Sequence, residues 1–377
     1  IKESTNNNII FVDYDPRLSS SIRSDSFYLF ELNKKLMPLN TVGIEEMDED
    51  HDKLAEYVID YAGKDFKVAV IANTIGEAKK IYRKLDGKGL KPVLLTSRMT
   101  PKDREDKIMH VREGSTRVLV STQVLEVGVD LSFDVVISEL SSPSSVVQRL
   151  GRLARGTKDE GYWLLFYTEK TLKDGSGIYN PCLVQCTKDF IESALSGGRK
   201  IHWHLPKVHG NDFTGYMELI DDCWSKCLSD KIYASNPLSE YIFSSPFISS
   251  QDAKKLIGNL REDSLCTIYL LDEHECPNTI SKFVEEAYSR SITTECEFAF
   301  NFINRALSKG CRVVKIVYRN GEELECSPLS ESGLKKLKDQ RIWGPPPGLI
   351  AFGVPKELYD EGIHGEGLKD PEENPCK

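Results

Sequence analysis

Short apolar runs separated by helical stretches dominate one part of the chain. Five runs have this character: KVAVIANT, KPVLLTS, TRVLVST, FDVVISEL and GYWLLFYT, from Lys67, Lys91, Thr116, Phe133 and Gly161. Runs that are apolar at successive positions are typical of parallel strands buried on both faces. Because strands alternate with helices, the pattern predicts a doubly wound parallel sheet. Ligands of such sheets bind beyond the carboxyl ends of the strands, where Asn73, Ser97, Thr122 and the loop after Leu140 are expected.

Helices are predicted between the first four of these strands. Apolar residues recur at helical spacing from Ile75 to Leu85, and a second stretch opens with Thr100, Pro101 and acidic residues in its first turn. Residues 53–62 are also expected to form a helix that leads into this unit.

The regions on either side are less regular. Residues 1–60 are acidic, with an apolar stretch at 9–14 and a weakly periodic run at 27–36, and we expect a linker or the tail of a preceding domain. Beyond residue 171 the pattern predicts helices at 181–196 and 215–229, a strand in CTIYLLDE, and a hairpin that turns at Asn320 and Gly321. The Pro- and Gly-rich tail from Pro345 to Lys377 is expected to be loop.

The predicted fold class is therefore α/β, with a parallel-sheet lobe at 61–170 and a smaller mixed α+β domain at 171–377. A chain of 377 residues with 40% apolar side chains can bury two or three such cores. No run approaches the roughly 18 apolar residues of a membrane span, and the N-terminus lacks a signal-peptide pattern. We expect a cytoplasmic protein with no membrane partner. Since the first residue is Ile1, we also expect a piece of a longer protein.

Charge is distributed unevenly along the chain. The net charge of −9 argues against a nucleic-acid partner, because nucleic acids repel an acidic surface. Residues 61–170, however, carry 19 Lys and Arg against 14 Asp and Glu. Basic charge is therefore concentrated in the predicted lobe.

All ten cysteines follow residue 180. Cys182 with Cys186, and Cys223 with Cys227, have helical i, i+4 spacing, and His202, His204 and His209 lie between the two pairs. A metal site, buried apolar thiols and disulfides of a protein from a hot environment all remain open. Structural zinc sites usually use tighter C-x2-C spacing, so we predict no metal.

The phrase QRLGRLAR carries the first candidate chemistry. Gln148, Arg152 and Arg155 are spaced by four and three residues, which would place them on one side of a helix. Guanidinium groups suit the negative charge of a transferring γ-phosphate, and arginines directed at a nucleotide held by another lobe act as arginine fingers. The alternative is a helix whose arginines form surface ion pairs.

The phrase STQVLEVGVD lies at the end of another predicted strand. Thr122 can offer its hydroxyl and amide to a nucleic-acid phosphate, Gly128 allows a close approach, and Asp130 can hold ribose or orient the arginines. For Glu126 and Asp130 the alternative is that both are solvated loop carboxylates.

The segments VIANTIGEAKKIYRKL, STQVLEVGVD and QRLGRLAR resemble, in this order, motifs IV, V and VI of superfamily 2 helicases. Their residues are similar to those of the helicase component of CRISPR type I interference. The resemblance covers about residues 67–170 and implies the second RecA-like lobe of an ATPase that uses ATP and Mg²⁺. It implies a first RecA-like lobe, a single-stranded DNA substrate pulled usually 3′ to 5′, and a histidine-aspartate nuclease. By resemblance the nucleotide would contact Gly128, Asp130, Gln148, Arg152 and Arg155. By the same resemblance DNA would contact Asn73, Thr74, Ser97, Arg98, Thr122 and Gln123.

Several parts of that machinery are missing from the sequence. There is no G-x-x-x-x-G-K-[ST] phosphate loop, so we expect ATP hydrolysis to need a first lobe outside this sequence. Two acidic phrases imitate the metal-binding motif, at 48–51 and 272–274, and we interpret both as acidic surface. No nuclease signature is present, since the adjacent pair His51 and Asp52 lies among acidic residues. A separate nuclease subunit would fit.

We therefore predict the C-terminal part of a single-stranded DNA translocase, whose last domain covers the DNA channel or docks a partner such as the CRISPR surveillance complex. One alternative is another superfamily 2 DNA-repair or RNA helicase. A second is a noncatalytic adaptor built on a lone motor lobe, which the missing phosphate loop would favour if the chain were complete.

Overall fold

A computed structural model describes residues 39–48, 50–126, 129–154, 161–207, 213–228, 265–272, 276–340, 345–346 and 348–373. All of them belong to one compact unit, Pro38–Lys377. The apolar stretches at 9–14 and 27–36 lie outside the described residues.

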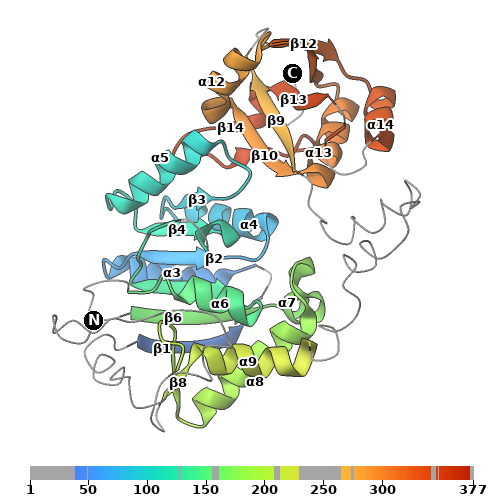
Figure 1. Cartoon of the computed structure of the whole chain (residues 1–377). Coiled ribbons are helices and arrows are strands. Elements are labelled where there is room, and N and C mark those ends of the chain that lie inside the picture. The colour runs from blue at the N-terminus through green and yellow to red at the C-terminus, as the bar shows by residue number, and fades with distance from the viewer. Residues whose placement is uncertain are drawn as a thin grey trace, which may run out of the picture. The chain divides into compact units, whose positions relative to one another are not determined.

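Six parallel strands form the first sheet, in the order β1-β6-β5-β2-β4-β3 (Figure 1). Their bounds are β1 Leu39–Glu46, β2 Val68–Ile71, β3 Val93–Leu95, β4 Val118–Ser121, β5 Val135–Glu139 and β6 Gly161–Tyr167. Every residue of β2, β3, β4 and β5 is buried, as expected for parallel strands covered on both faces. The five predicted strands and the predicted parallel α/β sheet are confirmed.

The predicted helices of this sheet are also confirmed. They are α3 Asp52–Gly63, α4 Ile75–Gly87 and α5 Pro101–Arg112. Thr74 caps α4 by accepting a hydrogen bond from the Glu77 amide, and Thr100 caps α5 in the same way. Pro101 occupies the first helical turn, where its missing N–H costs nothing.

The lobe extends beyond its predicted bounds of 61 and 170. β1 pairs with β6 along its length, so residues 39–46 belong to the sheet and not to a linker. On the other side, α7 Glu169–Asp174, α8 Pro181–Ser196 and α9 Tyr216–Leu228 lie beside the β1 and β6 end (Figure 1). The helices predicted at 181–196 and 215–229 are confirmed, but they belong with the first lobe, since α8 contacts β1 and α9 contacts α6 and α8. The short strands β7 Lys200–His202 and β8 Phe213–Gly215 lie between α8 and α9 in the chain.

A second, mixed sheet follows, in the order β10-β9-β13-β11-β12. Its bounds are β9 Leu265–Leu271, β10 Ser291–Glu295, β11 Val314–Asn320, β12 Glu323–Pro328 and β13 Leu349–Pro355. The helices are α12 Ile280–Arg290, α13 Cys296–Ser308 and α14 Glu331–Gln340. The mixed α+β domain and the hairpin are confirmed, but the turn is at Gly321 and Glu322, because Asn320 pairs with Glu323; Gly321 has the positive φ of +55° that this tight turn needs.

The prediction of loop from Pro345 to Lys377 was wrong. β13 lies in the middle of the second sheet, parallel to β9 and antiparallel to β11. Its sequence LIAFGVP is an apolar strand whose signal is obscured by the prolines at 345–347. Short pieces β14 Tyr359–Asp360 and β15 Gly367–Leu368 pair further along the same tail.

This tail also contacts the first lobe. The Tyr359 hydroxyl donates to the Asp103 carboxylate at 2.6 Å and accepts the Thr100 amide at 3.0 Å. Lys107 is buried on α5 and donates to the carbonyls of Ile363 at 2.9 Å and Gly365 at 2.7 Å. Burial lowers the pKa of Lys107 to about 8. Hydrogen bonds therefore join the C-terminal segment to α5.

Among the described helices, none is both long enough and apolar enough to cross a membrane.

Candidate nucleic-acid interface

A cleft of about 770 Å³ lies at the carboxyl edge of the first sheet. Residues that follow β2, β3 and β4 form much of its lining, because parallel strands end at one edge. All six residues predicted to contact nucleic acid line it: Asn73, Thr74, Ser97, Arg98, Thr122 and Gln123. The sheet thus brings together side chains that are up to fifty residues apart in the sequence.

The lining residues differ in how far they reach into the cleft. Ser97 is exposed and Thr74 is half-buried, whereas Thr122 is only 2% exposed. The Gln123 amide donates to the Asn73 carbonyl at 2.7 Å and is therefore partly committed within the protein. Ser97 and Thr74 are the most available polar groups of the predicted set.

Asn73 differs from its prediction as a direct contact. Its side chain is fully buried, donating to the Leu140 carbonyl at 2.8 Å and accepting from Arg149 Nη1 at 2.8 Å. Its backbone amide donates to Glu139 Oε2 at 2.7 Å. In this structure Asn73 orients the loop after β2 while its own polar atoms are engaged.

Arg149 is the functional residue that sequence reasoning missed. It lies on α6 Pro143–Leu150, is fully buried, and pairs with Glu126 at 2.8 Å while also donating to Asn73 and to the Tyr179 hydroxyl at 2.9 Å. Sequence spacing indicated Gln148 and Arg152 but not Arg149. A signal was present, because Arg149 shares the inward helix face of Ser145 and Val146 at i+4 and i+3.

The expected helix face of Gln148, Arg152 and Arg155 is wrong. Helix α6 ends at Leu150, so Gln148 is helical but Arg152 is not, and the Gln148 side chain is exposed. Gly151 caps the helix where a Cβ would lie 2.9 Å from the Val147 carbonyl oxygen, so a larger residue would force a shift. Arg155 and Gly128 lie outside the described residues.

Arg152 is buried in the turn after α6. Its Nη1 donates to the Val129 carbonyl at 2.5 Å and its Nη2 donates to the Glu126 carbonyl at 2.6 Å. Arg152 of QRLGRLAR thus binds the carbonyl groups of two residues of STQVLEVGVD, Glu126 and Val129. Asp130, one residue on from Val129, is exposed.

Glu126 lies where these contacts meet. Its carboxylate accepts from Arg149 Nε at 2.8 Å, its carbonyl accepts from Arg152, and it lines the cleft. The side chain is 9% exposed, so the interpretation of Glu126 as a solvated carboxylate is wrong. One residue therefore touches the cleft and both arginines.

Arg98 faces the cleft from the loop after β3 and also contacts the second sheet's region. It pairs with Glu295 at 3.5 Å, and its guanidinium lies over the Phe298 ring. Burial lowers the pKa of Arg98 to about 10, partly offset by Glu295. Its Nε and Nη1 atoms are buried and have no hydrogen-bond partner among the described residues.

Comparison with known proteins fits this geometry. The family model described as "CRISPR-associated nuclease/helicase Cas3, C-terminal" matches residues 64–158. A putative CRISPR-associated nuclease/helicase Cas3 of Methanocaldococcus jannaschii is 36% identical over 124 residues, which is 30% of this chain and 17% of the relative. The Cas3 protein of Methanothermobacter thermautotrophicus is 28% identical over 153 residues, 38% of this chain and 18% of the relative.

Residues 64–158, the Cas3-like region, are similar to the C-terminal part of Cas3 nuclease/helicases. The crystal structure of T. fusca Cas3-ATP has a TM-score of 0.48 with the chain at 16% identity, covering 69% of this chain and 36% of that one. The chain spans less than a fifth of the length of the two curated Cas3 relatives.

The acidic phrases outside the Cas3-like region have structural partners. Asp272 pairs with Arg290 at 2.6 Å, and Asp48 and Asp50 are exposed, as expected of acidic surface. His51, at the start of α3, does not fit that interpretation, because it is buried and hydrogen-bonds to Glu77 of α4. Glu49, Glu273 and His274 lie outside the described residues.

Of the two cysteine pairs at helical spacing, the outer residues form a disulfide and the inner residues are free thiols. Cys182 is bonded to Cys227, and the pairs Cys266–Cys296 and Cys276–Cys326 are also bonded. Cys186 and Cys223 are free. His202 and His204 belong to no potential metal cluster found among the described residues, and His209 lies outside them.

Proposed function

We propose that this chain is the C-terminal motor portion of an ATP-dependent single-stranded DNA translocase of CRISPR type I interference. The observation that carries the proposal is the cleft at the carboxyl edge, lined by residues from three strand ends within a Cas3-like region. A Cas3-type role in antiviral defence would place the protein in the cytoplasm.

The DNA backbone would lie along the cleft. Thr74, Ser97 and the loop at Thr122 offer hydroxyl or amide groups of the kind that bind phosphates without reading sequence. Arg98 supports this, since a phosphate would supply acceptors for guanidinium N–H groups that have none among the described residues. Affinity for single strands should therefore fall steeply with salt.

ATP and Mg²⁺ would be held mainly by a first RecA-like lobe. Residues of this lobe would face the nucleotide's far side, since exposed Asp130 follows Val129, whose carbonyl accepts from Arg152, and Gln148 is exposed on α6. Magnesium-bound ATP would supply the phosphoryl group to be transferred. Arg152, with Arg155, would stabilise the charge on that group, after Arg152 exchanges a carbonyl partner for phosphate oxygen.

Glu126 would couple the two sites. A strand in the cleft would contact the segment at 122–126, and that segment holds Arg152 through its carbonyl and Arg149 through its carboxylate. Movement of this segment on DNA binding would thus reposition Arg152. Hydrolysis would be stimulated by DNA for this reason.

The proposed partners are a first lobe, a histidine-aspartate nuclease on a separate polypeptide and the CRISPR surveillance complex. The names of the Cas3 relatives join nuclease and helicase activities, and no nuclease signature occurs in this sequence. Alone, the chain should bind ATP poorly and hydrolyse none.

The test is DNA-stimulated ATP hydrolysis in the assembly that supplies the first lobe. Arg152→Ala should lower turnover by about a thousandfold or more. Arg112→Ala, at an exposed position at the end of α5, is the matched control and should leave turnover unchanged. Near-normal turnover of a folded Arg152→Ala protein would defeat the assignment.

An RNA helicase is the second candidate. The ATP-dependent RNA helicase ddx19 of Dictyostelium discoideum is 26% identical over 141 residues, 31% of this chain and 30% of the relative. Stimulation of ATP hydrolysis by single-stranded RNA but not by DNA of the same sequence would favour this candidate over the first.

A further inference from the structure

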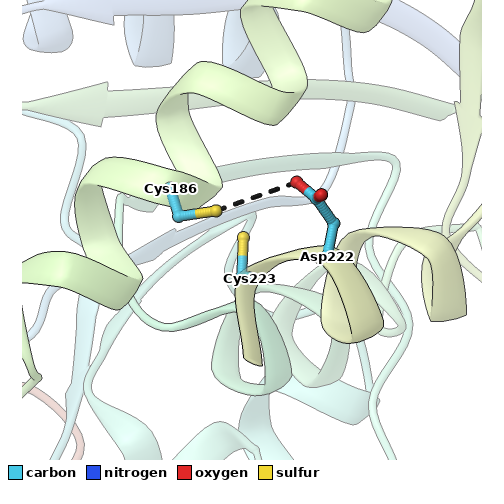
Figure 2. Close-up of side chains that lie close together, drawn as sticks. All are labelled: Cys186, Asp222 and Cys223. Atoms are coloured by element: carbon cyan, nitrogen blue, oxygen red, sulfur yellow. Dashed lines mark hydrogen bonds between the residues drawn. The ribbon is translucent and has the colours of Figure 1, made fainter. Parts of the chain in front are cut away.

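Two buried thiols face each other between α8 and α9. Cys186 and Cys223 point toward one another, with the Asp222 carboxylate beside them (Figure 2). Their Sγ atoms and one Asp222 oxygen all lie within 4.8 Å of one another. Cys186 is 8% exposed and Cys223 is fully buried.

The pair repeats the register of a disulfide one helical turn away. Cys182 and Cys227 are bonded, with their Cα atoms 5.8 Å apart. Cys186 is four residues after Cys182, and Cys223 is four residues before Cys227. Because residues four apart lie one above the other on a helix, an antiparallel pair that aligns 182 with 227 also aligns 186 with 223.

These two thiols differ from the other described cysteines. Cys182, Cys227, Cys266, Cys276, Cys296, Cys311 and Cys326 are all disulfide-bonded. Disulfides are rare in most cytoplasmic proteins but numerous in those of hyperthermophiles, so these disulfides fit the proposed cytoplasmic role in an organism from a hot environment. Within the described part of the chain, only Cys186 and Cys223 carry thiols, although they lie side by side.

We propose that Cys186 and Cys223 are an oxidation site at which a second disulfide closes between α8 and α9. The oxidant is a small disulfide or a protein disulfide. The Cys186 thiolate attacks it and releases one thiolate, forming a mixed disulfide. The Cys223 thiolate then attacks Cys186 Sγ and releases the second thiolate, and the two cysteine protons pass to the two released thiolates.

Access and charge favour Cys186 as the first attacker. It is the more exposed thiol, and, against burial and the opposing Asp222 and Asp189 carboxylates, the hydrogen bond with Cys223 and the charge of Lys226 lower its pKa. Burial raises the pKa of both thiols, so both are mainly protonated near neutral pH.

A metal site is the competing interpretation of the same three side chains. Structural zinc usually has four protein ligands, whereas this group offers three. The Asp222 oxygen nearest Cys186 is also the one that accepts from Lys226. The donor set therefore favours a disulfide over zinc.

The second disulfide would strengthen the support behind the motif VI helix. Helices α8 and α9 both contact α6, which carries Arg149. Two adjacent cross-links would fix the α8 and α9 pair against rotation as well as separation, and so hold α6 in place during motor movement.

The experiment is cysteine mapping of the full 377-residue chain. The protein is equilibrated with oxidised glutathione, denatured, alkylated and digested, and its peptides are identified by mass spectrometry. The expected result is a cross-linked peptide pair containing Cys186 and Cys223, with neither residue alkylated. Quantitative alkylation of both residues would overturn the proposal.

Two further measurements sharpen the result. Cys186→Ser should leave Cys223 alkylated, and Cys186→Ser/Cys223→Ser should lower the Tm of the oxidised protein by several degrees while Cys182–Cys227 stays bonded. Native mass spectrometry showing one zinc ion per chain that the double variant loses would contradict the disulfide. If the variants fail to fold, the mapping of the unaltered chain still decides.

Discussion

The two sheets of this protein are held together by different interactions. At the carboxyl edge of the first sheet, Asn73, Glu139 and Arg149 are buried and satisfy one another through hydrogen bonds. The second sheet has an apolar core around Phe300 and Phe352, with disulfides between its elements.

This difference matches the tasks proposed for the two regions. A buried polar network has specific partners and can rearrange when one partner moves, as a motor lobe must. An apolar core closed by disulfides resists unfolding but offers no alternative set of bonds. The first region should thus be sensitive to loss of single polar groups and to acid, and the second to loss of its cross-links.

Removing Arg149 should have the largest effect. Arg149→Ala leaves Glu126 and Asn73 buried without their main partner, and should lower the free energy of unfolding by about 3–5 kcal/mol. Gln148→Ala is the control, because its exposed side chain should change stability by less than about 0.5 kcal/mol. Urea unfolding followed by circular dichroism measures both. A cost for Arg149→Ala near that of the control would show that the network contributes little.

Removing a disulfide should act on the second sheet alone. Cys266→Ala/Cys296→Ala should cost about 2–4 kcal/mol, because the unfolded chain regains the freedom of a closed loop. Hydrogen exchange is the measurement, and protection should fall in β9 and β10 while β2 and β4 keep theirs. Equal loss in both sheets would mean that the two regions unfold together, and the comparison would then fail.

Acid should act first on the first region through His202. Burial and the neighbouring His204 lower the pKa of His202 from 6.5 to about 4, so it stays neutral in the folded protein. Between pH 6.5 and 4 the unfolded chain binds a proton that the folded chain does not. Stability therefore decreases as the pH is lowered through this window, by up to about 1.4 kcal/mol per pH unit.

The variant His202→Gln separates this effect from general acid denaturation. Its stability should vary less between pH 6.5 and 4 than that of the unaltered protein, while His110→Gln, at a half-buried position on α5, should keep the original slope. Parallel pH curves for His202→Gln and the unaltered chain would contradict the assignment.

The smallest effect is expected where the two regions meet. Tyr359→Phe removes the hydroxyl between Asp103 and the Thr100 amide, and should cost about 1 kcal/mol. Tyr318→Phe is the control, since Tyr318 is 48% exposed. Thermal unfolding should show a lower Tm for the first variant only, and an unchanged Tm for both would mean that this contact adds nothing.

The first sheet could be predicted because each buried strand is a continuous apolar run. β1 escaped prediction because LNTVGIEE alternates polar and apolar residues and lies in an acidic segment. β13 escaped because prolines precede it, and its place in the sheet depends on pairing with β9, about eighty residues earlier. Such long-range pairing leaves no local signal.

The residues of the cleft were predictable, but the roles of the arginines were not. Strand ends indicate where Thr74, Ser97 and Thr122 meet, since parallel strands share an edge. Sequence spacing assumed that α6 continues through Arg152, whereas the helix ends at Leu150. The burial of Arg149 depends on Asn73 and Glu126, which come from other loops and are invisible to spacing.

Photo-cross-linking is the most direct test of whether the cleft binds single-stranded DNA. An oligonucleotide containing 4-thiothymidine is bound to the full chain and irradiated, and the cross-linked peptides are sequenced by mass spectrometry. We expect adducts at 74–75, 97–98 and 122–124, reduced in Ser97→Glu but not in Ser115→Glu at the opposite edge of the sheet. Adducts confined to the opposite edge or to the second sheet would contradict this expectation.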